Sequence, residues 1–528
     1  MMNLLLSTTF WATLVLTIGL LVARWRRRDS FTLLVRLVSA RVVFALLLCG
    51  SLVYVGFSTY LGYVAPRDVL QDIVAAQEWQ HGRSMHPENL SGLIRESLAD
   101  DHAAFSLGAW WPRLADVEQE QLQRVLTSHW VQAHPPPMTL LLSPLVAWSG
   151  IHGSCIVINL VSLFALLLTL VMIHRGLALP LTRQQALVLA IMVLGWHPIG
   201  AVLRNGQSGL VLGLLMTAGW LALRRNQPVL AGLSIGLATS LKLYPGLLLV
   251  YLFFRHRRAF VAAAGCLLLI TTGTGLIAGW HHFADYFQTA RLVSEVYGPN
   301  TSNLSLLALL LRLANELSIA PGLARGLFGV LGLTIVVGLV GIIRSRNVEV
   351  TRPTWNLDVE FSLCLTLIPL LSPIAWNHYL PIILLPLAVL GQRVLERPRA
   401  LALKFLGLFL VLAVPEQTWS WLADTAEGSL PSLLILFTTT LPTFALLALS
   451  GWLAALAKER PSETRAVIAT SRDRVTFVAL RNRLAGDLAE RHAGSLSGEA
   501  VGIGAVSQDE AVGAIDVQIR RGLQQGLG

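Results

Sequence analysis

The chain has 528 residues, of which 54% are hydrophobic and only 13% are charged, and its mean hydropathy is +0.63. These values exclude a soluble globular protein and indicate a polytopic α-helical membrane protein. A β-barrel is disfavoured, because continuous apolar runs of about 20 residues recur where a barrel would show short alternating strands. The four cysteines lie in apolar segments without paired spacing, so neither a disulfide framework nor a metal site is predicted.

The formal net charge of +10 would also suit a nucleic-acid-binding protein. The basic residues, however, cluster at the ends of apolar segments. The clusters are Arg24 with Arg26–Arg28, Arg224 with Arg225, Arg255 with Arg257 and Arg258, and Arg344 with Arg346. Such clusters mark the cytoplasmic loops of membrane proteins. We therefore predict membrane lipids, and no nucleic acid, as the surroundings of these charges.

The apolar segments predict about 11 to 13 transmembrane helices. Residues 3–23 form a first helix whose N-terminus lies outside, because an arginine cluster follows it. Residues 42–63 return the chain to the outside, where residues 64–136 form the longest polar loop, with helical periodicity near 115–127. The apolar run at 138–150 is too short to span comfortably and is expected to be re-entrant.

Further spans are predicted near 155–173, 185–203, 208–223, 260–279, 323–343, 401–416 and 431–455. Shorter apolar runs at 305–316, 361–371 and 379–391 are expected beside loops of the outer face, the first of which is 280–304. The apolar stretch 227–254 is interrupted by Lys242 and Pro245, and arginine clusters flank both of its ends. Two short helices that meet at Lys242 on the outer face satisfy the charge rule better than one long helix.

This pattern divides the chain into three parts. Residues 1–41 are an extra N-terminal helix with a basic cytoplasmic loop, and residues 42–455 are a transmembrane core whose extracytoplasmic loop is 64–136. Residues 456–528 are a polar tail, which we expect in the cytoplasm. No chemistry is evident in the tail, so the core is where a functional site is expected.

Two carboxylates follow the second span and are the first candidates for chemistry. Asp68 and Asp72 are four residues apart, so on a helix they would share one face. A carboxylate at this place could take the proton from an attacking hydroxyl group. Alternatively, an aspartate near a helix start serves as an N-terminal cap that is favourable for the macrodipole. The spacing alone leaves both explanations open.

Other polar side chains gather at the outer ends of the apolar segments. They are His134, Arg204, Asn205, Gln207, Lys242, Asn303, Arg312, Trp376 and His378. A charge near the membrane interior costs about 2.5–3.5 kcal/mol on insertion scales, so it needs a partner or a function. Arg204 and Lys242 could stabilise a phosphate leaving group, or they could extend toward the lipid headgroups. Trp376 could stack on a ligand or lie in the interfacial aromatic belt, and the two histidines could orient a substrate or serve the structure.

A transporter is the main alternative to an enzyme. It would place charged residues at the bilayer midplane and would repeat its helices in inverted order. The polar residues of this chain instead collect at one interface, and no such repeat is evident. A non-catalytic scaffold is the weaker alternative, because it would not need two carboxylates in the long loop. The pattern therefore favours an enzyme over a transporter or flippase.

Taken in order, four segments resemble glycosyltransferase family 87, a family with the GT-C fold. The first segment runs from Asp68 to Gly82 and has an alanine pair seven residues after Asp68, and the second is His134-Pro-Pro. The third begins with Arg204-Asn-Gly-Gln207 and continues through Gly232, Gly236, Lys242 and Pro245. The fourth runs from Asn303-Leu-Ser305 to Arg312 and is followed by Ser372-Pro through Trp376-Asn-His378. The resemblance covers about residues 45–395. The family usually has an aromatic residue where Asp72 stands, which favours Asp68 over Asp72 as the catalytic carboxylate.

The resemblance implies an inverting transfer of a sugar, above all mannose, from a polyprenyl phosphate to a lipid-linked or cell-envelope glycan. The active site would face outward from the plasma (inner) membrane, with Asp68 as general base. The other implied site residues are Asp72 and His378 as catalytic groups, and His134, Arg204, Asn205, Gln207, Lys242, Asn303 and Trp376 as substrate-binding groups. Arabinofuranose and glucose are alternative sugars. Some relatives of the fold use a divalent cation, and the sequence leaves metal dependence open.

Overall fold

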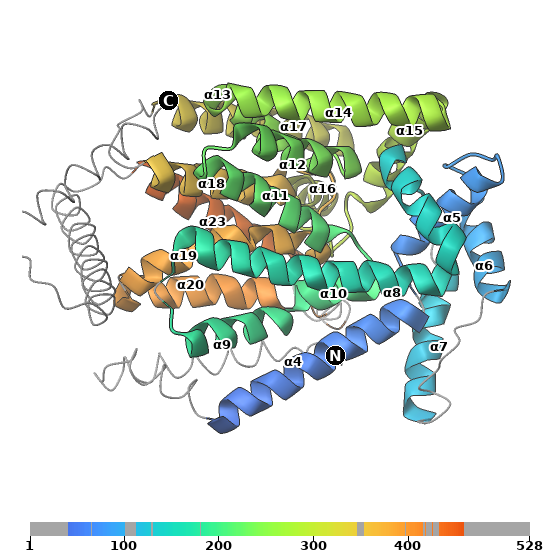
Figure 1. The fold of residues 1–528 in the computed structure, drawn as a ribbon, viewed down its shortest axis with the longest axis horizontal. Coiled ribbons are helices and arrows are strands. Elements are labelled where there is room, and N and C mark those ends of the chain that lie inside the picture. Colours follow the sequence, from blue (N-terminus) through green and yellow to red (C-terminus); the bar gives the residue numbers. More distant parts are fainter. Residues whose placement is uncertain are drawn as a thin grey trace, which may run out of the picture. The chain divides into compact units, whose positions relative to one another are not determined.

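The computed structural model describes residues 41–64, 66–100, 112–127, 130–179, 181–345, 353–396, 398–414 and 432–458, with residues 418 and 425. Within these ranges the protein is helical and has no strand, which confirms the predicted all-α fold (Figure 1). The chain divides into two compact units, Met1–Glu459 and Arg460–Gly528, and every helix named below belongs to the first. The predicted first span, its arginine cluster and the predicted tail beyond Lys458 lie outside the described residues.

Helix α4 (Arg41–Val64) occupies the predicted second span and leads into a loop that is itself folded. The loop contains α5 (Val69–Gln80), α6 (Leu90–Asp100) and α7 (Pro112–Thr127), and the periodicity near 115–127 is that of α7. Apolar side chains of α5 and α6 pack together with residues of α8 as a separate small core. This core fixes the start of α5, where the two candidate carboxylates lie.

Helix α8 (Pro136–Leu177) is 42 residues long and is kinked at Gly150, whose φ is 66° and ψ is −167°. This backbone conformation is essentially confined to glycine. The run at 138–150, predicted as a separate re-entrant segment, forms the first arm of α8, and the predicted span 155–173 belongs to the second arm. Because the backbone of Gly150 is not helical, the two arms are separate helices that meet at a kink.

The predicted span 185–203 is a bent pair of helices. Helices α9 (Arg183–Leu194) and α10 (His197–Asn205) meet at an angle of 50°. Pro198 lies in the first turn of α10, where a missing backbone N–H costs nothing, so a new helix can begin there. Trp196 is buried at the bend, and its Nε1 donates a hydrogen bond of 3.2 Å to the carbonyl oxygen of Leu412.

The predicted break at Lys242 is confirmed. After α11 (Gly209–Arg224), helix α12 (Pro228–Leu241) ends at Lys242, a short 3₁₀ turn η1 (Tyr244–Gly246) follows, and α13 (Leu247–Arg255) begins. Lys242 has an extended backbone, with φ of −148° and ψ of 139°. The chain then turns into α14 (Arg257–Ala278), which packs along α12.

Close packing of α12 against α14 depends on glycine. A Cβ atom at Gly232 would lie 2.2 Å from the carbonyl oxygen of Ala259 and 2.9 Å from the amide nitrogen of Ala263. We expect Gly232→Ala to destabilise the protein by about 1–3 kcal/mol, the usual cost of overpacking. Thermal unfolding in detergent would measure this. Gly265→Ala on α14 is the matched control, because a Cβ there meets nothing within 4 Å, and its melting temperature should not fall. Equal melting temperatures for the two variants would refute the close contact.

The second half of the bundle adds a helix that hydropathy did not predict. Helix α15 (His281–Tyr297) fills most of the predicted outer loop 280–304. The remaining elements are α16 (Leu306–Glu316), α17 (Pro321–Ser345), α18 (Pro353–Leu371), η2 (Asn377–Ile383), α19 (Leu384–Glu396), α20 (Pro398–Ala413), α22 (Ser432–Thr439) and α23 (Leu441–Lys458). The predicted span 431–455 is therefore two helices, and buried α18 packs against the second of them.

Among the described residues, five helices are long and apolar enough to cross a membrane, or six if the bent pair α9–α10 counts as one span. Further apolar helices, α11, α12 and α13 among them, are shorter than the roughly 20 residues that a single crossing needs. The predicted 11 to 13 included the span 3–23, which lies outside the described residues, and several other predicted spans are broken into short helices. Large apolar side chains of α14 and α17 are exposed, as expected of surfaces that face lipid.

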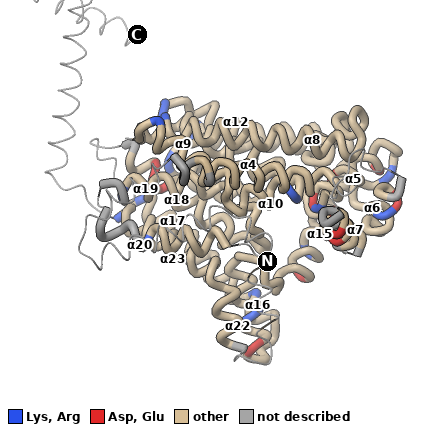
Figure 2. Tube along the Cα trace, turned by 90° about the horizontal axis from the view of Figure 1, so that it is seen from below, with Lys and Arg blue, Asp and Glu red and all other residues tan. Residues whose placement is uncertain are grey.

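The end of the bundle away from α5, α6 and α7 carries a group of basic residues together with acidic ones (Figure 2). Two buried carboxylates of α18 pair with arginines there. Arg224 Nη1 lies 2.6 Å from Asp358 Oδ2, and Arg255 Nε lies 3.4 Å from Glu360 Oε2. The pairs connect the predicted cytoplasmic clusters to the middle of the bundle, and neither acidic partner was expected from the sequence.

Candidate functional site

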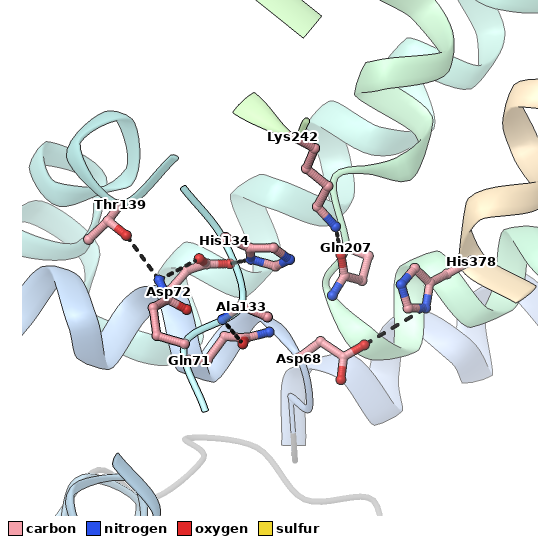
Figure 3. A network of polar contacts seen from close by, with 10 residues as sticks. Asp68, Gln71, Asp72, Ala133, His134, Thr139, Gln207, Lys242 and His378 are labelled. Atoms are coloured by element: carbon pink, nitrogen blue, oxygen red, sulfur yellow. Dashed lines mark hydrogen bonds and ion pairs between the residues drawn. The ribbon is translucent and has the colours of Figure 1, made fainter. Parts of the chain in front are cut away.

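Six of the predicted site residues meet in one polar network (Figure 3). They are Asp68, Asp72, His134, Gln207, Lys242 and His378. Their elements differ: the start of α5, the segment before α8, the α10–α11 turn, the end of α12 and η2. Segments that are distant in the sequence therefore contribute one or two side chains each. The helix break at 242 matters because it turns a buried helix end toward the network.

Asp72 is held on both of its carboxylate oxygens. His134 Nδ1 lies 2.7 Å from Oδ2, and Gln132 Nε2 donates to Oδ1 at 3.1 Å. Gln132 donates a second hydrogen bond of 3.0 Å to Thr139 Oγ1. All four side chains are buried. Asp72 therefore fixes the approach to α8, and its oxygens are already engaged.

Asp68 is placed differently. It precedes α5, but its side chain makes no capping hydrogen bond, so the capping explanation accounts only for its position and not for its carboxylate. The side chain is 28% exposed, and Oδ2 lies 3.8 Å from His378 Nδ1, which is too long for a hydrogen bond. The carboxylate is thus accessible, and an imidazole lies within one small movement of it.

Lys242 brings a buried positive charge to the same network. The residue is 4% exposed, and Nζ donates a hydrogen bond of 2.6 Å to Gln207 Oε1. Nζ also lies 5.4 Å from the centre of the Tyr379 ring, a cation–π distance. The charges of Asp72 and Asp68 act on it from farther away. A buried ammonium whose direct contacts are an amide and a ring is suited to attract an anion.

Arg204, Asn205 and Trp376 lie next to this network in the sequence and the fold. Arg204 and Asn205 are buried in the last turn of α10, directly before the turn that carries Gln207. The amide oxygen of Asn205 is buried without a hydrogen-bond partner. Trp376 precedes η2 and contacts the ring of Tyr297 edge to face, with the ring centres 6.1 Å apart. These residues frame the network.

Asn303, which the family resemblance implies as a substrate-binding residue, makes hydrogen bonds to two loops. Its side-chain nitrogen donates to the carbonyl oxygens of Gly298 at 3.0 Å and Pro373 at 3.2 Å. Its oxygen accepts from the amides of Ser305 at 3.1 Å and Ala375 at 2.9 Å. The side chain is fully buried, so it holds the loop before α16 to the loop before η2.

Arg312 resembles Asn303 in its role. Its guanidinium donates to the backbone carbonyl oxygens of Ala308, Thr301 and Asn303 at 3.0–3.1 Å. Each guanidinium nitrogen of Arg312 thus donates to a backbone carbonyl oxygen, as expected of a residue that stabilises the fold.

The sequence did not identify three groups that support the site. Gln132 orients Asp72, Gln71 Oε1 accepts a hydrogen bond of 3.0 Å from the amide of Ala133, and Tyr379 lies over Lys242. Gln132 and Tyr379 adjoin predicted residues, two positions before His134 and one after His378. That proximity is the only signal in the sequence that points to them.

A further histidine lies close to the network, in the loop between α5 and α6. Burial lowers the pKa of His86 to about 4, an effect that the charges of Asp285 and Asp72 oppose only in part. The ring is therefore neutral near pH 7. Burial likewise raises the pKa of the neighbouring Tyr286 to about 12, so its hydroxyl remains protonated.

The middle of the chain is similar to known proteins. Residues 132–373 match the model of glycosyltransferase family 87. A polyprenol-phosphate-mannose-dependent alpha-(1-2)-phosphatidylinositol mannoside mannosyltransferase of Mycobacterium tuberculosis is 26% identical over 311 residues, which cover 53% of this chain and 67% of that protein. No solved structure matches the chain significantly. The matched region contains His134, Gln207 and Lys242 and ends at Pro373, shortly before His378. This multi-pass membrane protein is a membrane glycosyltransferase that is similar to glycosyltransferase family 87 over residues 132–373.

Proposed function

We propose that the protein transfers mannose from a polyprenyl-phosphate donor to a hydroxyl group of a lipid-linked or cell-envelope glycan, with inversion at the anomeric carbon. The observation that carries the proposal is the presence of an accessible carboxylate, Asp68, and a buried ammonium, Lys242, in one network (Figure 3). The relative named above depends on polyprenol-phosphate-mannose and acts on a phosphatidylinositol mannoside. The phosphate of a polyprenyl-phosphate donor carries the negative charge that Lys242 is suited to attract.

In the proposed reaction, the Asp68 carboxylate takes the proton of the acceptor hydroxyl as its oxygen attacks the anomeric carbon. The bond between that carbon and the phosphate oxygen breaks, and the phosphate leaves with the electron pair. Lys242 stabilises the negative charge that grows on the phosphate. Asp72 and His134 position the segment before α8, and His378 orients the acceptor beside Asp68.

We assign the active site to the extracytoplasmic face of the plasma membrane. The support is the distribution of charge: Arg224 and Arg255 lie at the helix ends away from the network, in clusters typical of cytoplasmic loops. On this assignment residues 42–455 form the catalytic unit, and residues 64–136 are its extracytoplasmic catalytic loop.

The test is a single-turnover transfer assay with the full chain in nanodiscs. The protein receives radiolabelled polyprenyl-phosphate-mannose and a membrane glycolipid extract, and labelled glycolipid is the expected product. The polyprenyl phosphates of glucose and arabinofuranose serve as parallel donors that identify the sugar. A second arm uses protein in sealed vesicles with donor on one side only. If label crossed the bilayer without being joined to an acceptor, the result would contradict the proposed transfer and would indicate a flippase.

A further inference from the structure

A second cluster of polar side chains lies beside the site, outside the proposed chemistry. It consists of His86, in the loop between α5 and α6, and of His282 and Asp285, in the first turns of α15. One potential ligand atom from each residue lies within 4.8 Å of the others. His282 Nδ1 and Asp285 Oδ2 are 3.9 Å apart.

His282 is buried and the ring nitrogens of the half-buried His86 are shielded from solvent, yet these imidazoles lack the hydrogen bonds that such groups normally make. The ring nitrogens of His86 and Nδ1 of His282 have no hydrogen-bond partner of normal geometry, although the backbone of His134 lies close enough to interact with His86. Buried polar atoms in folded proteins are almost always paired, so three unpaired nitrogens in one place require an explanation. The Tyr286 ring, whose centre is 6.2 Å from that of His86, closes one side of the cluster.

We propose that His86, His282 and Asp285 bind a divalent transition-metal ion, with Zn²⁺ as the ion that best suits the donor set. Two imidazoles and one carboxylate match the ligands of zinc sites that have three protein ligands and one open position. Mg²⁺ and Ca²⁺ prefer oxygen ligands throughout, so the two histidines argue against them.

The three potential ligand atoms need to move only slightly closer together to bind zinc. Zinc lies about 2.0–2.2 Å from nitrogen and oxygen ligands, which places tetrahedral ligand atoms roughly 3.5 Å from one another. The separation of 3.9 Å between His282 and Asp285 is already close to this value. Asp285 has a side chain that is 39% exposed and can move toward the histidines, and the same opening admits water as the fourth ligand.

Such an ion would join two segments that are far apart in the chain. It would fasten the loop after α5 to α15, and α15 lies at the same end of the bundle as α5 to α7 (Figures 1 and 2). The charge of Asp72 and the backbone of His134 both act on the ring of His86. The ion would therefore hold the loop in place next to the Asp72–His134 pair, as a positioning element that need not contact substrate.

The experiment measures the metal itself. Full-length protein in nanodiscs is dialysed against Zn²⁺ and then against metal-free buffer, and bound zinc is counted by mass spectrometry. We expect about one zinc per wild-type chain and close to none for His86→Ala or His282→Ala, since a site with three protein ligands rarely survives the loss of one. Co²⁺ in place of zinc should give wild-type protein the visible absorption of a tetrahedral site, and Asp285→Asn should weaken it.

His281→Ala is the matched control, because His281 adjoins His282 in the sequence but is exposed and lies outside the trio. It should keep its zinc. Chelation should lower the melting temperature of wild type and of this control, and leave that of His282→Ala unchanged. Equal zinc in all variants, or no zinc in the wild type together with a melting temperature that ignores chelators, would overturn the site. None of these readouts depends on sugar transfer, so the outcome is separate from that of the proposed function.

Discussion

Asparagine in place of Asp68 is expected to slow sugar transfer by about 10²–10⁴-fold, the usual contribution of a general base. The amide keeps the size of the side chain but cannot take the acceptor proton. Asp68 makes no capping hydrogen bond and is partly exposed, so the variant should fold as wild type does. Single-turnover transfer and equilibrium binding of the donor, measured on the same nanodiscs, would separate chemistry from binding.

Asp72→Asn is the control that distinguishes a base from a positioning residue. Both oxygens of Asp72 are engaged by His134 and Gln132, so this change should lower the melting temperature as well as the rate. Asp68→Asn should lower the rate alone. A wild-type rate for Asp68→Asn together with a lost rate at full stability for Asp72→Asn would move the base to Asp72.

Methionine in place of Lys242 is expected to reduce the single-turnover rate by about 10²–10³-fold, the scale on which preorganised charge stabilises a leaving group. The change removes the ammonium that Gln207 and Tyr379 hold in a buried position. The rate should fall further than donor affinity does, because the charge on the phosphate grows as the glycosidic bond breaks. Rapid-quench transfer and donor binding together measure this difference.

Two variants accompany Lys242→Met. Lys242→Arg keeps a positive charge but changes its shape, so it should restore only part of the rate. Arg291→Met removes a positive charge from an exposed position on α15 and should leave the rate unchanged. If Lys242→Met weakened donor binding and left the single-turnover rate intact, Lys242 would serve ground-state binding and not the leaving group.

The fold was predictable wherever hydropathy and local chemistry agree. The break at Lys242 combines a charge with Pro245, and both oppose a continuous apolar helix, so the sequence indicates the break directly. Gly150 gives no such signal, because glycine is common in membrane helices and only its positive φ reveals the kink. Helix α15 was missed because its polar composition resembles that of a loop, although its backbone is helical.

The site was predictable in its residue types and in the expectation that several of them gather in one place. Which side chains touch was not predictable, since that depends on contacts between segments far apart in the chain. Asn303 illustrates the limit, because the sequence does not show that its amide makes hydrogen bonds to the backbone of the loop at 373–375. The trio of His86, His282 and Asp285 was equally hidden, because its members share no motif spacing.

The kink at Gly150 has a consequence for how the enzyme tolerates different bilayers. Membrane helices adjust to lipid thickness mainly by changing their tilt. The second arm of α8 carries Ala165, Leu166 and Ile173 of the main core, so it would tilt together with the packed helices. The first arm leaves Gly150 in its own direction and carries Thr139, which accepts a hydrogen bond from Gln132 beside Asp72. We therefore expect a change of hydrophobic thickness to tilt the bundle as one body, and the polar network with it.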